Sequence, residues 1–476
     1  MRKLFAMAVI VFFSRVVCAG QAVGASSQAG TPLEIGSQLQ LFVDRYVIGS
    51  MTNLELRLQQ PVKQPLARSP FAGYYATVIK DGDLYRAYWR SEFMARPDDK
   101  RPTEIYRYAE SRDGHEWDYP SLGLHEVEGS TSNNVIFKSV HNFSPFLDTK
   151  PGVPASERFK GLAGRAGLQA FLSEDGIHWK DTYVMVRNRR GGPPYTGCVI
   201  EWDPVWTNAF DSQNVSFWSE AEQQYVCYFR TYGSPNGEKK PVRTISRVTS
   251  TNFLGEWSKP VTMEANDPGE NLYTSQTQPY FRAPHIYLAF PTRLITARGS
   301  STDILFMSTR PGSTRYERLF KEAFIRPGPD PERWGNRANY AALNVVPTGP
   351  DEMSIYHSNS GYRYVLRTDG FVSVHAGAGE GELLTKYFKF TGGELLINYS
   401  TSASGSIRVE IQDGNGKPIP GFRLMDCAPV VGDKIEQDVK WGKDSVLKAL
   451  EGRPVRLRFV MMDCDLYSFR FGDGKI

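Results

Sequence analysis

Cysteine, net charge and long apolar runs are all scarce in this sequence. Only 5 of its 476 residues are cysteine, and neither a CxxC nor an HExxH spacing occurs, so there is no zinc signal. The net charge is +4, with Lys and Arg scattered among acidic residues, whereas clustered basic residues are typical of nucleic-acid binding. After residue 20 no segment is apolar enough to span a membrane. We therefore expect no nucleic-acid partner, no membrane span and no cofactor, and nothing argues for or against a structural calcium ion.

The first twenty residues have the pattern of a secretory signal peptide. A basic start is followed by an apolar run over residues 4–13 and by small residues at 17–20, which is the order such signals use. Lipid modification of Cys18 is the alternative, but Arg15 stands three residues before it, where an apolar residue is usual. We predict that residues 1–20 are removed and that the protein is secreted or periplasmic.

Four cysteines remain after such a cleavage. An exported protein permits disulfides, so Cys427 could pair with Cys464 in the C-terminal region, and Cys198 with Cys227. Spacing alone does not decide between paired and free thiols.

A short turn pattern repeats along the first three-quarters of the chain. Ser-x-Asp-Gly-x-x-Trp occurs at residues 111–117 and 173–179, with weaker copies at 249–257 and 308–316. Asp-Gly favours a tight turn because glycine accepts positive φ, and each copy follows a short strand-like run. Repetition every 59 to 78 residues fits four-stranded propeller blades, whereas the repeat of a β-helix would be much shorter. We predict a five-bladed β-propeller over residues 38–367.

The composition changes after residue 370. Short alternating strands are expected at 395–399, 407–411 and 455–460, with a strong turn signal at 413–416. This all-β pattern predicts a separate C-terminal β-sandwich over residues 371–476.

Several motifs resemble those of exported bacterial five-bladed β-propeller proteins related to glycoside hydrolases of families 32 and 43, a largely uncharacterised group. They are the repeated turns and the segments at 42–48, 210–214, 278–287, 367–377 and 466–469. The resemblance implies a sugar-cleaving site at the mouth of the central channel. The chain lacks the Trp-Met-Asn-Asp-Pro-Asn-Gly type motif of family 32 and its Glu-Cys pair, so its catalytic acids must be argued from position.

Glycoside hydrolysis uses two carboxyl groups, and in a propeller the innermost strand of each blade lines the channel. Acids near the starts of those expected strands are therefore the catalytic candidates, each of which could instead be structural. They are Asp211, Asp148, Asp44 and Glu270, with Asp303 and Glu322 as weaker candidates.

Other polar residues near the same strands are candidates for substrate binding. Arginines converging on one channel suit a carboxylate or sulfate, which guanidinium groups bind through two hydrogen bonds; the alternative is that each lies on its own solvated loop. The candidates are His141, Asn142, Asn214, Gln276, Arg282, His285, Arg293 and Arg337, and Arg333 lies nearby.

These features predict an exported glycoside hydrolase acting on a poly- or oligosaccharide, which a uronic or sulfated sugar would suit. Two alternatives stay open. A non-catalytic glycan-binding propeller would show aromatic platforms without paired acids. A polysaccharide lyase would need a Tyr or His base and a group that neutralises a uronate. The sugar, the linkage and the oligomeric state do not follow from the sequence.

Overall fold

The computed structural model describes residues 31–65, 73–94, 100–165, 167–187, 209–335, 337–442 and 445–474. Over these ranges the chain forms β-strands and short 3₁₀ turns without an α-helix, which confirms the all-β prediction. No helix within them has the length and apolarity needed to cross a membrane. The predicted signal peptide and Cys198 lie outside the described residues.

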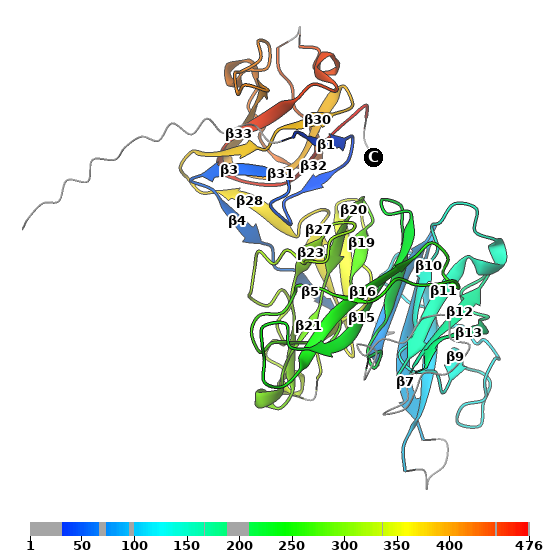
Figure 1. Ribbon diagram of the computed structural model, residues 1–476. Helices are drawn as coiled ribbons and strands as arrows, with labels where there is room; N and C mark the ends of the chain where they lie inside the picture. Colours follow the sequence, from blue (N-terminus) through cyan, green and yellow to red (C-terminus); the bar gives the residue numbers. More distant parts are fainter. Residues whose placement is uncertain are drawn as a thin grey trace, which may run out of the picture.

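Six small sheets make up the lower body in Figure 1. Three of them have four antiparallel strands and follow one another along the chain. Their strands are β6 (Tyr74–Asp81), β7 (Leu84–Phe93), β8 (Thr103–Ser111) and β9 (Val135–Lys138); β10 (Ser144–Leu147), β11 (Phe159–Gly164), β12 (Gly167–Ser173) and β13 (Lys180–Arg187); and β14 (Val215–Ser219), β15 (Gln224–Gly233), β16 (Val242–Ser250) and β17 (Val261–Thr262).

The next segment forms two three-stranded sheets, and a five-stranded sheet follows them. The three-stranded sheets are β18 (Asn271–Leu272), β21 (Thr292–Ile295) and β22 (Ser301–Ile304), and β19 (Gln278–Tyr280), β20 (Ala283–Ala289) and β23 (Met307–Thr309). The last sheet holds β24 (Tyr340–Ala341), β25 (Val346–Pro347), β26 (Glu352–Ser358), β27 (Tyr362–Arg367) and β5 (Val62–Pro65).

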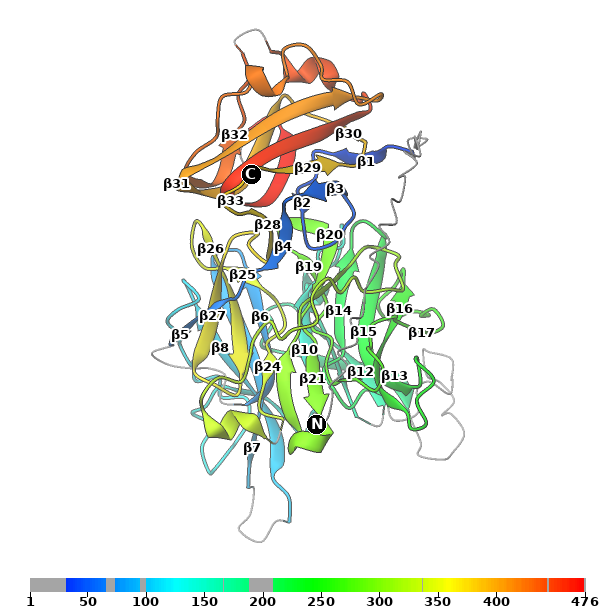
Figure 2. The ribbon, with the colours of Figure 1, turned by 90° about the vertical axis from the view of Figure 1, so that its left-hand side faces the viewer.

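The first strands of successive sheets pack against one another and close a ring. β6 contacts β10, β10 contacts β14 and β14 contacts β19. The fourth segment reaches the last sheet through β22 and β24, and β24 and β25 contact β6 again. The outermost strand of the last sheet, β5, comes from far earlier in the chain and pairs antiparallel with β27. Figure 2 shows β5 beside β27, so main-chain hydrogen bonds tie this early segment to the last sheet.

The repeated Ser-x-Asp-Gly turns lock neighbouring sheets together. Gly114 and Gly176 have φ of +76° and +77°, conformations that glycine adopts without the steric cost a Cβ would bring. Tyr356 Oη donates a hydrogen bond to Gly114 O over 2.7 Å, and Tyr88 Oη donates one to Gly176 O over 3.0 Å. Each of these two turns thus docks on a tyrosine of an adjacent sheet.

A ten-stranded sheet forms the upper body in Figure 1. Its two longest strands, β31 and β33, pair antiparallel along most of their length, and their apolar faces enclose a separate core rich in phenylalanine. The strands are β1 (Leu33–Gly36), β2 (Gln40–Leu41), β3 (Ile48–Thr52), β4 (Glu55–Leu58), β28 (Val372–Ala376), β29 (Gly381–Thr385), β30 (Phe388–Phe390), β31 (Glu394–Asp413), β32 (Asp433–Asp438) and β33 (Val455–Gly472).

The first strands of the chain belong to this upper sheet. β2 pairs with β33, β3 with β29 and β4 with β28, although the sequence-based division places residues from 38 onward in the first domain. Pairing between segments more than 300 residues apart leaves no local pattern in the sequence, because each strand alternates in the same way whichever partner it has.

The two C-terminal cysteines are separate, buried thiols, so they do not pair with each other. Cys427 Sγ accepts a hydrogen bond from Val409 N, and Cys464 Sγ donates one to Ser406 O. Burial raises the pKa of Cys464 to about 12. Cys227 is also a free, buried thiol.

Candidate functional site

A histidine bridges two carboxylates where the inner strands begin. His141, just before β10, contacts Glu104 Oε2 through Nδ1 at 2.5 Å and Asp211 Oδ1 through Nε2 at 3.0 Å. Glu104 lies at the start of β8, and Asp211 lies in the loop before β14. The side chain of Asp211 is 47% exposed, so the three residues, which we call the His141 bridge, reach solvent.

The His141 bridge holds opposite charges in one place. Burial disfavours the imidazolium, but hydrogen bonds to Asp211 and Glu104 outweigh it and raise the pKa of His141 above its ordinary value. Burial also disfavours both carboxylates, but the hydrogen bonds from His141 lower the pKa of Glu104 and of Asp211. Both carboxyl groups are therefore ionised at neutral pH.

Arg90 of β7 contacts Glu104 of the His141 bridge and Asn142, the residue after His141. Its Nη1 donates to Asn142 Oδ1 over 2.8 Å and lies 3.8 Å from Glu104 Oε1. The guanidinium group also covers the rings of Tyr74 and Tyr75. Arg90 therefore ties the start of β6 to the loop before β10.

Three further guanidinium groups meet around Tyr273, next to the His141 bridge. Arg230 and Arg243 each lie 5.1 Å from the ring centroid of Tyr273, and Arg337 Nη1 donates to the Tyr273 hydroxyl over 3.3 Å. Among the described residues, Asp211 is the one carboxylate paired with any of these arginines, at 3.5 Å from Arg230. We call Tyr273 and its three arginines the Tyr273 cluster.

The Tyr273 cluster carries excess positive charge in a partly buried place. Arg230 is only 4% exposed, and neither Arg230 Nε nor Arg243 Nε has a hydrogen-bond partner in the described part of the chain. Arg243 Nη1 donates to the neutral Asn271 Oδ1, so among the described residues three guanidinium charges face the single carboxylate of Asp211. Such an excess of positive charge favours the binding of an anion. Burial disfavours the Tyr273 phenolate, but the charges of Arg230 and Arg337 outweigh it, and the pKa of Tyr273 lies below the ordinary tyrosine value.

Backbone strain and buried hydrogen bonds hold these side chains in position. Asn214 Nδ2 donates to Phe210 O and Ser212 O and so fixes the turn that carries Asp211. Ser212 Oγ donates to Tyr273 O over 2.8 Å, which joins the turn to the Tyr273 cluster. Left-handed backbone at non-glycine residues costs about 1–3 kcal/mol each and is concentrated at functional sites; here it occurs at Tyr75, Asn142, Phe210 and Arg337.

Gln276 is buried among the inner strands and joins them through hydrogen bonds. Its Nε2 donates to Gln213 Oε1 over 2.6 Å and to Ala341 O over 2.9 Å, and Gln213 Nε2 donates to Thr77 Oγ1. A mainly apolar cavity of about 700 Å³ lies at the opposite ends of the inner strands, lined by residues such as Trp218, Phe281 and Leu343. The His141 bridge and the Tyr273 cluster, which together we call the charged mouth, lie near the starts of the inner strands and away from this cavity.

Three of the predicted catalytic acids lie outside the charged mouth. Asp148, at the far end of β10, is fully buried between Lys160 Nζ at 2.8 Å and Tyr225 Oη at 2.7 Å. Asp44 pairs with Arg310 at 2.7 Å. Their contacts account for both carboxylates as structural groups.

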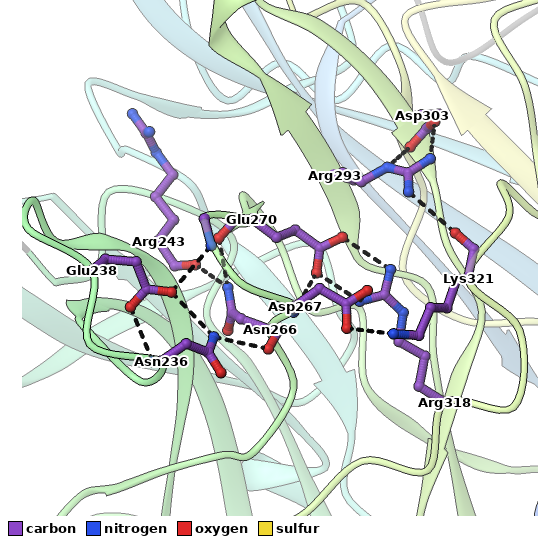
Figure 3. Close-up of polar contacts among 11 residues, drawn as sticks. Asn236, Glu238, Arg243, Asn266, Asp267, Glu270, Arg293, Asp303, Arg318 and Lys321 are labelled. Carbon is purple, nitrogen blue, oxygen red and sulfur yellow. Dashed lines mark hydrogen bonds and ion pairs between the residues drawn. The ribbon is translucent and has the colours of Figure 1, made fainter.

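Glu270 belongs to an ion-pair network beside β18 and β21, shown in Figure 3. Its carboxylate accepts two hydrogen bonds from Arg318, at 2.6 and 2.9 Å, and Arg293 pairs with Asp303 close by. The guanidinium group of Arg243 points away from this network in Figure 3. Glu270 thus pairs with Arg318, and Arg293 pairs with Asp303. None of these ion pairs includes a residue of the His141 bridge.

The remaining predicted residues are divided among other places. Arg282 pairs with Glu436 of the upper sheet and with Asp369, so it joins the two bodies. His285 lies near Asp44 and Arg310, where burial and the charge of Arg310 lower its pKa to about 4. Arg333 is buried against Asn339 and His357, and Glu322 is exposed.

The structure therefore unites four predicted site residues, namely Asp211, His141, Asn142 and Arg337. Sequence reasoning missed Glu104, Arg90, Arg230, Arg243 and Tyr273. Most of these lie within strands whose alternating pattern also suits ordinary sheet residues, so nothing local distinguished them. Within the described residues no group of three or more His, Cys, Asp or Glu side chains is placed to hold a metal ion.

Comparison with known proteins finds no matching family model and no matching curated protein. Solved structures of low sequence identity resemble the chain, among them carbohydrate-active enzymes. A protein named glycoside hydrolase matches with a TM-score of 0.42 and 12% identity over 65% of this chain and 91% of its own. A family 43 arabinoxylan arabinofuranohydrolase from Bacillus subtilis matches with a TM-score of 0.39 and 12% identity, over 85% of this chain and 96% of its own. An α-L-arabinanase from Penicillium chrysogenum matches with a TM-score of 0.37 and 10% identity, over 69% of this chain and 94% of its own. At such TM-scores these likenesses assign the chain neither a family nor an activity.

Proposed function

We propose that this protein is an exported enzyme that cleaves a glycosidic bond in an anionic poly- or oligosaccharide, at the His141 bridge and the Tyr273 cluster. The observation that carries the proposal is the meeting of three guanidinium groups around Tyr273 with one carboxylate between them. A uronate or sulfate would balance the remaining positive charge. A guanidinium group can bind either anion through two parallel hydrogen bonds.

The proposed scaffold is a five-bladed propeller with a C-terminal sandwich. The closed ring of sheets supports it, with the first three sheets as one blade each. The two three-stranded sheets of residues 271–309 together supply a fourth blade, and β24 to β27 with β5 supply the fifth. The ten-stranded sheet, folded around its own core, supplies the sandwich.

Hydrolysis of the glycosidic bond is the first candidate reaction. It uses a carboxylate that attacks the sugar or activates water, together with a proton donor. Asp211 is ionised and half-exposed, which suits the first role. His141, whose pKa is raised, can supply the proton, and Glu104 stabilises its charge from the other side.

Elimination by a polysaccharide lyase is the second candidate, and one observation favours it. Neither carboxyl group of the His141 bridge has the raised pKa that a carboxylic acid donor needs. A tyrosine, a histidine and cations for a uronate stand together instead.

Product analysis tests the proposal. The protein, Asp211→Asn and Arg243→Gln are incubated with neutral, uronic and sulfated glycans, and products are weighed by mass spectrometry. Arg315→Gln is a matched control, because Arg315 is exposed and lies away from the cluster. We expect cleavage of an anionic glycan that both site variants weaken at least tenfold and the control does not. Hydrolysis adds one water to the products, and elimination does not. Binding without cleavage would favour a glycan-binding propeller instead.

A further inference from the structure

Tyr273 stands out among the tyrosines of the charged mouth. Its side chain is largely buried, at 5% exposed, but its hydroxyl accepts a hydrogen bond from Arg337, which is an exposed residue. Tyr340 and Tyr75 pack beside it, with ring centroids 5.8 Å from Tyr273 to Tyr340 and 5.6 Å from Tyr75 to Tyr340. Burial raises the pKa of both neighbours, whereas that of Tyr273 is lowered. The charges around Tyr273 thus favour the loss of its proton over that of its two neighbours.

The reason is the set of charges that face Tyr273. Arg230 comes from β15, Arg243 from β16 and Arg337 from the loop before β24. Within the described ranges, Asp211 is the one carboxylate paired with any of these arginines, and it contacts both Arg230 and His141. The surroundings favour a phenolate, and that anion would sit between cations that also attract an anionic substrate.

We propose that Tyr273 is the catalytic base of a β-elimination on a uronate-containing glycan. The inference rests on the proposed function, because it assumes that an anionic glycan is cleaved at this mouth. Arg243 and Arg337 hold the uronate carboxylate and withdraw charge from it, which makes the neighbouring carbon–hydrogen bond more acidic. His141 is the proton donor to the departing sugar, through the Nε2–H that it otherwise gives to the half-exposed carboxylate of Asp211.

The step balances without any co-reactant. The Tyr273 phenolate takes the proton from the carbon that bears the carboxylate. The electron pair of that bond forms a carbon–carbon double bond, and the adjacent carbon–oxygen glycosidic bond breaks. The leaving oxygen takes a proton from His141, so Tyr273 ends neutral and His141 ends neutral. Proton exchange with solvent restores both groups.

This assignment leaves Asp211 and Glu104 as positioning residues in the elimination. Both accept hydrogen bonds from the His141 ring nitrogens, so they keep the imidazole charged and oriented. Neither needs to become protonated, which agrees with the lowered pKa of each.

The first test is a titration that needs no substrate. Ultraviolet difference spectra of the wild type against Tyr273→Phe are expected to show one tyrosine that ionises at lower pH than the others. Tyr340→Phe is the matched control, since it removes a neighbouring phenol of similar burial and should keep that early transition. If the wild type shows no such early transition, or if Tyr273→Phe keeps it, the assignment of Tyr273 as the base is overturned.

The second test uses polygalacturonate, alginate and glucuronate-containing polysaccharides as probes. We expect unsaturated products, detected by their ultraviolet absorbance and mass. Tyr273→Phe should lower kcat by about 10²-fold or more, the usual effect of removing a general base, with little change in KM. Arg337→Gln should move the acidic limb of the pH–rate profile to higher pH, because Tyr273 loses its hydrogen-bonded cation.

The outcomes separate the two proposals. Hydrolysed products alone would overturn the role of Tyr273 and leave the proposed function standing. If elimination occurs and Tyr273→Phe does not slow it, the role of Tyr273 as the base is also overturned. Failure to cleave any anionic glycan would overturn both proposals.

Discussion

Substituting Gly176 by alanine tests whether the repeated turns lock the sheets together. Gly176 has φ of +77°, and a residue with a Cβ pays about 1–2 kcal/mol in this region. A Cβ there would also lie 2.6 Å from the Tyr88 hydroxyl, the group that donates to Gly176 O. Displacing that hydroxyl loses a hydrogen bond of about 0.5–1.5 kcal/mol. We expect Gly176→Ala to lower the free energy of unfolding by about 2–3 kcal/mol.

A second glycine provides the control for backbone strain alone. Gly152 also has φ of +77°, but a Cβ there would meet nothing within 4 Å. Gly152→Ala should therefore cost only the conformational part, about 1–2 kcal/mol. Unfolding by urea, followed by tryptophan fluorescence, measures both variants. In a Tyr88→Phe background the hydroxyl is absent, and Gly176→Ala should then cost no more than Gly152→Ala. Equal losses for the two glycine variants in the wild-type background would refute the docking role of the turn.

Two further predictions concern charges in the ring. Asp148→Asn should destabilise the protein by about 1.5–3 kcal/mol, the usual contribution of a hydrogen bond between charged groups. The ammonium group of Lys160, 2% exposed, loses its buried carboxylate and keeps only its contacts with Glu157; an unchanged unfolding midpoint would contradict this. The raised pKa of His141 implies that its stabilising effect is complete below the ordinary histidine pKa and is lost as the pH rises through the folded-state value. The lowered pKa values of Glu104 and Asp211 imply a second loss as the pH falls below the ordinary carboxyl range. Melting temperatures of the wild type and of His141→Gln across pH 3–9 should differ most between these two limits, and parallel curves would disprove the coupling.

Local signals in the sequence were sufficient for the turns and for part of the site. The Ser-x-Asp-Gly pattern marks Gly114 and Gly176, whose positive φ follows from the turn itself. Asp211, His141 and Asn142 were predicted because polar residues just before an inner strand point toward the channel, and the structure brings them together. Asp148 was misleading, since it lies at the end of β10 rather than its start, and the direction of a strand within the ring is not visible locally.

The residues that only the folded chain reveals come from outside the inner strands. Arg90 and Glu104 lie on β7 and β8, the second and third strands of the first sheet, and both take part in contacts at the His141 bridge. Arg230 and Arg243 do the same for Tyr273 from β15 and β16. An arginine that alternates with apolar residues on a strand looks the same in sequence whether it faces solvent or a site.

The sequence by itself determined the all-β class, the repeated turns and the loop that presents Asp211, because each depends on the conformational preferences of a few adjacent residues. The tertiary structure decided which side chains meet. It paired β1 to β4 with the C-terminal strands and placed β5 in the last sheet of the ring. It also gathered three arginines around Tyr273 from three separate segments. Charge balance and the pKa of a group depend on distances between distant parts of the chain, and those distances exist only once the ring of sheets has closed.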